Sequence, residues 1–90
     1  MEENKPEGAP IWWDFEHIIS SLDAREMIAQ GKHPLSNALE MADQMESGDI
    51  FELITPFPPN PLIDKMVAKG MDSFTEQVNA TTFKNYFYKS

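Results

Sequence analysis

The chain is short, acidic and free of cysteine. Its 90 residues carry a formal net charge of −8, and 41% of them are hydrophobic, which is enough for one folded domain with a modest core. The negative charge opposes binding to nucleic acid or to anionic lipid, because both would be repelled. The lack of cysteine excludes disulfides, thiolate chemistry and cysteine-based metal sites. No apolar run is long enough to span a membrane and no signal peptide opens the chain, so we expect a cytoplasmic location.

The first ten residues differ in character from the rest. Residues 1–10 are acidic, contain proline and show no periodicity, which predicts a disordered tail ahead of a single domain over residues 11–90. Trp12, Trp13 and Phe15 then follow closely in the sequence. They either form a partner-binding peptide, since tryptophan is enriched in binding hot spots, or fold back to cover an open side of the domain. The second interpretation is favoured.

Alternating residues predict the first strand at residues 17–22, with Ile18, Ser20 and Leu22 on one side. Residues 25–30 are then expected to form a helical turn that Gly31 ends. This turn leads into the first of two amphipathic helices.

The first helix is expected to begin with His33 as N-cap and Pro34 at the first helical position, where a missing N–H costs nothing. Gly48 is placed to end it in a left-handed conformation. One apolar stripe recurs at helical spacing. Its members are Leu35, Ala38, Leu39, Ala42 and Met45.

The next strand, residues 50–54, is apolar on both faces and therefore reads as an inner strand of a sheet. Asn60 is expected to cap a second helix, with Pro61 at its first position and Gly70 at its end.

Two further strands, at residues 73–79 and 82–88, are close enough to pair as an antiparallel hairpin. The element order is therefore β-α-β-α-β-β. Because a β-α-β unit joins parallel neighbours by a right-handed crossover, this order predicts an α/β two-layer sandwich, with a mixed four-stranded sheet and two helices on one face. The other face of the sheet is left partly open.

Four short motifs occur in order along these elements. They are Leu22-Asp23-Ala24-Arg25, Lys32-His33-Pro34-Leu35, Ser47-Gly48-Asp49 and Pro59-Asn60-Pro61-Leu62. Over roughly residues 18–88 the chain resembles the sulfur-carrier (SirA/TusA-like) superfamily, and more closely its cysteine-free branch of uncharacterised prokaryotic domains. That branch typically reads Leu-Asp-x-Arg, Arg-His-Pro-Leu, Pro-Gly-Glu and Asp-His-Asp-Pro-x-Pro-Leu.

The resemblance implies the same two-layer fold. Sulfur carriers place a Cys-Pro pair at the start of the first helix, and His33 and Pro34 stand at the matching positions here. Because an imidazole does not carry a persulfide as a thiol does, sulfur relay is not supported. The cysteine-free branch has a second histidine before its second helix, where this chain has Phe57, so a site of two histidines is not expected.

A candidate site lies where the two helices start. If the first two strands are parallel, the loops that follow them leave from one edge of the sheet, and the starts at His33 and Asn60 should lie about one helix diameter apart, ~10 Å. With Lys32 and Arg25 they would form an anion-binding corner in an acidic protein. Asp23 completes the ligand-binding set, although Asp23 and Arg25 have an alternative role as an ion pair that holds the loop. His33 has the alternative of a simple helix cap.

These residues favour a non-catalytic module that binds a partner protein or a small anionic ligand. The alternative is a small enzyme or metal-linked regulator that uses His33. No catalytic residue, metal site or cofactor is assigned from the sequence, because it contains no nucleophilic triad, phosphate-binding glycine loop or calcium loop. A homodimer through the open face of the sheet is a further expectation.

Overall fold

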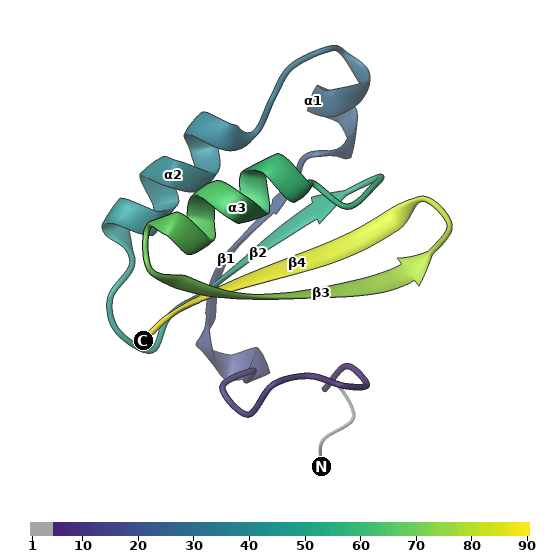
Figure 1. The fold of residues 1–90 in the computed structure, drawn as a ribbon. Coiled ribbons are helices and arrows are strands. Elements are labelled where there is room, and N and C mark those ends of the chain that lie inside the picture. Colours follow the sequence, from purple (N-terminus) through teal and green to yellow (C-terminus); the bar gives the residue numbers. More distant parts are fainter. Residues whose placement is uncertain (1–4) are drawn as a thin grey trace.

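The computed structural model describes residues 5–90, which form a four-stranded sheet with helices on one face (Figure 1). The elements in chain order are the 3-10 helix η1 (Phe15–His17), β1 (Ile18–Asp23), α1 (Arg25–Ala29), α2 (Leu35–Gln44), β2 (Ile50–Thr55), α3 (Asn60–Ala68), β3 (Met71–Asn79) and β4 (Thr82–Lys89). The strand order is β1-β2-β4-β3, with β1 parallel to β2 and the other neighbours antiparallel. This confirms the predicted α/β two-layer sandwich with a mixed sheet and the two main helices, α2 and α3, on one face.

The main core lies between the sheet and the two helices. Residues of β2 and β4 that face the helices pack there against the apolar sides of α2 and α3. They are Phe51, Leu53 and Phe87. Ala38 and Ala42 from α2 and Leu62 and Met66 from α3 are buried there. β2 is buried on both faces, as its continuous apolar sequence predicts for an inner strand.

The opposite face of the sheet carries a second, aromatic cluster. Trp13 is 6% exposed and packs edge-on against Tyr86, with ring centroids 5.6 Å apart. Trp12 and Ile50 belong to the same cluster. The prediction that the tryptophans fold back over the open face is therefore confirmed.

The tail expected over residues 1–10 lies partly outside the described residues. Within the described part, Pro6 is buried and Ala9 packs against the aromatic cluster around Trp13. The segment from residue 5 to Trp13 thus lies along the face of the sheet away from the helices, at the lower end of Figure 1. We call this segment, residues 5–13, the N-terminal strap.

The prediction that Ile18 lies on the same face of β1 as Leu22 is wrong. The β1–β2 register shifts between Ile18 and Ser20, and such a bulge places the residues on its two sides out of phase. Ile18 therefore packs into the aromatic cluster, whereas Leu22 packs against the helix-side core.

The expected helix starts are each wrong by one residue. Pro34, not His33, is the N-cap of α2, because the Pro34 carbonyl accepts the first helical hydrogen bond, from Ala38 N–H at 2.9 Å. Pro59, not Asn60, is the N-cap of α3, because the Pro59 carbonyl accepts a helical hydrogen bond from Ile63 N–H at 2.9 Å. Neither of these two helices has a side-chain N-cap among the residues described.

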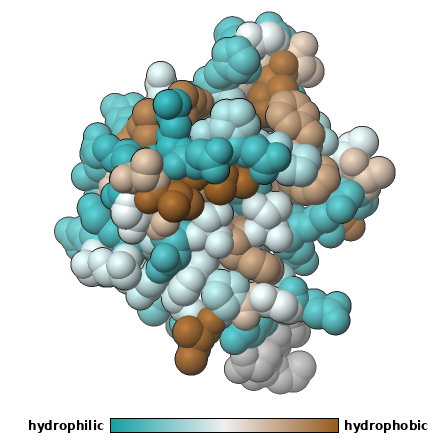
Figure 2. All heavy atoms as spheres, in the orientation of Figure 1, coloured by the Kyte–Doolittle hydropathy of each residue, from teal (hydrophilic) through white to brown (hydrophobic). Residues whose placement is uncertain are grey.

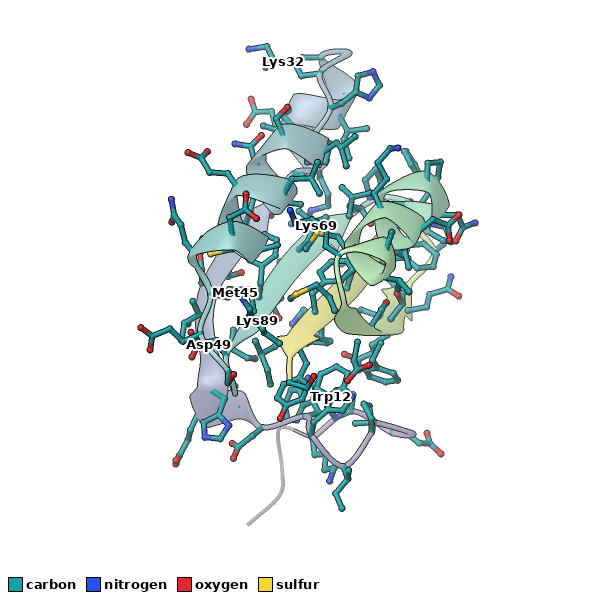
Figure 3. The ribbon with its side chains drawn as sticks, turned by 60° about the vertical axis from the view of Figure 1, so that its left-hand side comes forward. Trp12, Lys32, Met45, Asp49, Lys69 and Lys89 are labelled. Carbon is teal, nitrogen blue, oxygen red and sulfur yellow. The ribbon has the colours of Figure 1, made fainter. Side chains whose placement is uncertain are left out.

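The end of the first helix also differs from expectation. α2 stops at Gln44 because Met45 turns into an extended conformation and is buried in the core. Lys89 Nζ donates to the Met45 carbonyl at 2.9 Å, in the position from which a cation stabilises a helix C-terminus (Figure 3). Gly48, with φ of +94°, lies instead in the turn before β2, and its N–H donates to the Lys89 carbonyl. By contrast, Gly70 ends α3 with φ of +93°, as predicted.

Candidate functional site

Asp23 and Arg25 form a two-pronged ion pair just after β1. Arg25 Nη2 and Nε donate to the two carboxylate oxygens of Asp23 at 2.6 and 2.9 Å, and Arg25 Nη1 donates to Thr82 Oγ1 at 3.1 Å. The hydrogen bonds from Arg25 hold the pKa of Asp23 below its usual value. The loop after β1 is thereby fastened to the start of β4. The expectation that these two residues act as an ion pair that holds the loop is confirmed.

Lys32 and His33 are placed by the end of α1. Gly31, with φ of +83°, follows the helix, its N–H donates to the Ile28 carbonyl, and Lys32 N–H donates to the Met27 carbonyl at 2.9 Å. These two bonds form a Schellman motif, which requires a left-handed residue at the glycine. The chain therefore turns sharply before α2 and leaves Lys32 and His33 exposed on the surface.

The starts of α2 and α3 meet at a groove of about 360 Å³. Its walls come from the end of α1, the loop into α2 and the turn between β2 and α3. The lining residues are Ile28, Gly31, Lys32, His33, Pro34, Leu35, Phe57, Pro59, Pro61 and Leu62. Both helix starts thus lie at one edge of the sheet, as the parallel pairing of β1 with β2 predicts.

The chemistry of this groove is mostly apolar. Among its described lining residues, only Lys32 and His33 have polar side chains, Lys32 is cationic, and none is acidic. Hydrophobic residues gather on the upper right of Figure 2, over the end of α1 and the turns beside the helix starts. The groove offers an apolar floor with a cationic rim in a chain of net charge −8.

The structure brings together only part of the predicted corner. Lys32 and His33 line the groove, whereas Asn60, Arg25 and Asp23 do not. Asn60 is exposed on the first turn of α3 and its backbone N–H donates to the Pro58 carbonyl at 3.0 Å. Arg25 is held by Asp23 and Thr82, so its guanidinium is directed to the loop and the hairpin.

Phe57 is the lining residue that sequence reasoning treated only as a missing histidine. Its side chain is 49% exposed, and its carbonyl accepts a hydrogen bond from Thr55 Oγ1 at 2.7 Å. Thr55 is fully buried, so this bond anchors the turn from inside the sheet. The sequence signal was present: prolines on both sides of Phe57 hold the turn extended, and an extended turn presents its aromatic ring at the surface.

The described residues contain neither a cluster of metal ligands nor a helix that could span a membrane. Within residues 5–90, no three histidine or acidic side chains gather in a way that could hold a metal ion. None of the helices in that range has the length and apolar composition needed to cross a membrane. Lys32 and Trp12 lie at opposite ends of the molecule, so the groove is remote from the strap (Figure 3).

Comparison with known proteins adds no relative. Neither family models nor curated proteins nor solved structures give a match to this chain. The resemblance to cysteine-free sulfur-carrier domains therefore stays a prediction from the motifs.

Proposed function

We propose that this chain is a non-catalytic binding module for a small amphiphilic anion, such as an aliphatic or aromatic carboxylate. The proposal depends on one observation: the groove at the helix starts is apolar except for Lys32 and His33 at its rim. A volume of about 360 Å³ is in the range of small-molecule sites, which combine apolar walls with a few polar groups.

The rim determines which head group is preferred. A carboxylate near Lys32 gains a charge-assisted hydrogen bond, whereas an ammonium group there meets a like charge. The apolar part of the ligand would lie against Leu35, Phe57 and Pro61 and remove their surface from water. The net charge of −8 repels any anion at long range, so the ligand must gain its affinity from direct contact in the groove.

A set of three ligands with one chain length tests the proposal. Octanoate, octanamide and octylammonium share their hydrocarbon tail and differ only in head-group charge. In a titration followed by backbone amide NMR, octanoate should shift the signals of Gly31, Lys32 and Leu35. Octanamide should bind more weakly than octanoate, and octylammonium should bind most weakly. Equal binding of the three, or shifts confined to other parts of the chain, would contradict the proposal.

A pair of charge-neutralising variants locates the head group. Lys32→Gln removes the charge at the rim and should weaken octanoate binding while leaving octanamide binding unchanged. Lys65→Gln removes an exposed charge of the same kind from α3, outside the groove, and should leave both unchanged. If both variants reduce octanoate binding equally, the effect is one of net charge and not of the rim.

The alternative, an enzyme or metal-linked regulator that uses His33, stays a prediction. Zinc, iron or copper added stoichiometrically would shift the His33 ring signals if the metal version is right. The cytoplasmic location and the homodimer through the open face likewise stay predictions, and the strap already occupies part of that face.

A further inference from the structure

A second groove, of about 320 Å³, runs beside β1 on the side of the molecule away from the hairpin. One wall is the strand itself, through Ser20, Ser21 and Leu22, with Phe51 of β2 behind it. The other wall is a stripe of α2 at helical spacing. Its members are Asn37, Glu40, Met41 and Gln44.

The strand that forms this wall lies at the edge of the sheet. In the described sheet β1 pairs only with β2, so one row of its backbone groups has no strand partner. Ala24 N–H donates to the Ile54 carbonyl at 2.8 Å, which directs Ala24 toward β2. Because the direction alternates along a strand, Ser21 and Asp23 direct their N–H and C=O groups outward.

We propose that this edge binds an extended segment of a partner protein rich in lysine or arginine, which adds to the sheet as a fifth strand beside β1. Main-chain hydrogen bonds to Ser21 and Asp23 would supply affinity, and alternate side chains of the segment would enter the groove under α2. A basic side chain entering there meets Glu40, while the amides of Asn37 and Gln44 offer hydrogen bonds.

Charge selects this occupant over a second copy of the chain. Among the described lining residues Glu40 is the only charged one, and the whole chain carries −8. Two copies paired through β1 would bring like charges together, whereas a basic segment would be attracted from a distance.

The probe is an eight-residue peptide of alternating lysine and valine with blocked ends, titrated into the full chain and followed by backbone amide NMR. The shifts should be confined to β1 and the α2 stripe. A peptide in which glutamate replaces every lysine should not bind, and N-methylation of the valine amides should abolish binding by removing main-chain donors. Binding of the glutamate peptide, or undiminished binding of the N-methylated one, would overturn the proposal.

Two variants of Ser21 distinguish binding through its backbone N–H from binding through its side-chain hydroxyl. Ser21→Pro removes the outward N–H, a change that an edge strand tolerates, and should abolish binding. Ser21→Ala keeps the N–H and loses only the hydroxyl that donates to Glu52 Oε1 at 2.6 Å, so it should bind as the original chain does. Equal binding by these two variants would overturn the proposal, because the main chain would then not be the contact.

A charge reversal keeps the test valid if Ser21→Pro does not fold. Glu40→Lys should lower the affinity for the lysine–valine peptide roughly tenfold, since an attractive exposed charge pair becomes a repulsive one. Asp64→Lys makes the same net charge change on the exposed side of α3 and should have little effect. Equal weakening by both variants, or light scattering that shows a dimer paired through β1, would reject a basic partner segment as the occupant.

Discussion

Trp12 stacks on Tyr88, with ring centroids 5.0 Å apart and planes within 6° of parallel. The contact joins the N-terminal strap to the end of β4, and Trp13 adds an edge-on contact to Tyr86 one pleat away. Offset or edge-on aromatic pairs add to the free energy that burial alone provides. The strap therefore serves as the missing second layer over part of the open face.

Trp13→Ala should lower the free energy of unfolding by about 3 kcal/mol, because it removes a large side chain that is 6% exposed. Trp13→Phe should cost less, since it keeps a ring and removes an indole N–H that is buried without a hydrogen-bond partner among the described residues. Urea denaturation measures both. Ile11→Ala, at a side chain that is 96% exposed, is the control. A Trp13→Ala variant as stable as Ile11→Ala would show that the strap does not pack in solution.

Asn85 is the second position where a substitution should be costly. Its side chain is fully buried in the sheet, donates to the Leu53 carbonyl at 2.9 Å and to Thr55 Oγ1 at 3.0 Å, and accepts from Thr75 Oγ1. Asn85→Ala should cost about 3 kcal/mol, because it leaves a void and buried partners without hydrogen bonds. Thr75→Val should cost about 1 kcal/mol. The loss of stability in the double variant should be smaller than the sum of the losses in the two single variants. Strict additivity of these losses would argue against a shared network.

The Asp23–Arg25 pair predicts a dependence on pH. The pKa of Asp23 is lowered in the folded chain by hydrogen bonds from Arg25, while the unfolded chain has the ordinary value. The pair therefore contributes stability above that ordinary value, and the contribution is lost as the pH falls through the folded-state pKa. Asp23→Asn should lower the urea midpoint at neutral pH and have no effect in strong acid. An equal effect at both pH values would show that the hydrogen bonds matter without the charge.

Phe57→Ala should separate binding from stability. Because the ring is half exposed, its loss should change the free energy of unfolding by no more than about 0.5 kcal/mol. The same variant should weaken the binding of octanoate and of octanamide equally, since the tails of both ligands contact the apolar floor of the groove. If octanoate binds to Phe57→Ala as tightly as to the original chain, the ligand does not lie in this groove.

The sequence determines the elements more reliably than their ends. Period-two alternation predicted the hairpin, and the proline and glycine signals predicted α3 to within one residue. The end of α2 was not predictable from Gly48, because burial of Met45 stops the helix earlier. The face of Ile18 was not predictable either, since a bulge depends on how β1 and β2 align and not on β1 alone.

The convergence of the two helix starts was predicted, but the residues that line the groove between them were predicted only in part. Parallel strands place the loops before α2 and α3 at one edge, which followed from the element order. Which side chains enter the groove depends on local bonds. Arg25 is turned away by Asp23 and Thr82, and Phe57 is presented by the bond from Thr55 to its carbonyl. Neither bond could be inferred from residue types at their spacing.

The strand order β1-β2-β4-β3 has a consequence for how the chain emerges from the ribosome. β4 is the last of the described strands to be synthesised, yet it lies between β2 and β3 and supplies Tyr86, Phe87 and Tyr88 to the two faces. Until β4 leaves the exit tunnel, β3 has no partner in the described sheet, and Trp12 and Trp13 lack their ring partners Tyr88 and Tyr86. The nascent chain therefore cannot complete the aromatic cluster or the four-stranded sheet before β4 has emerged.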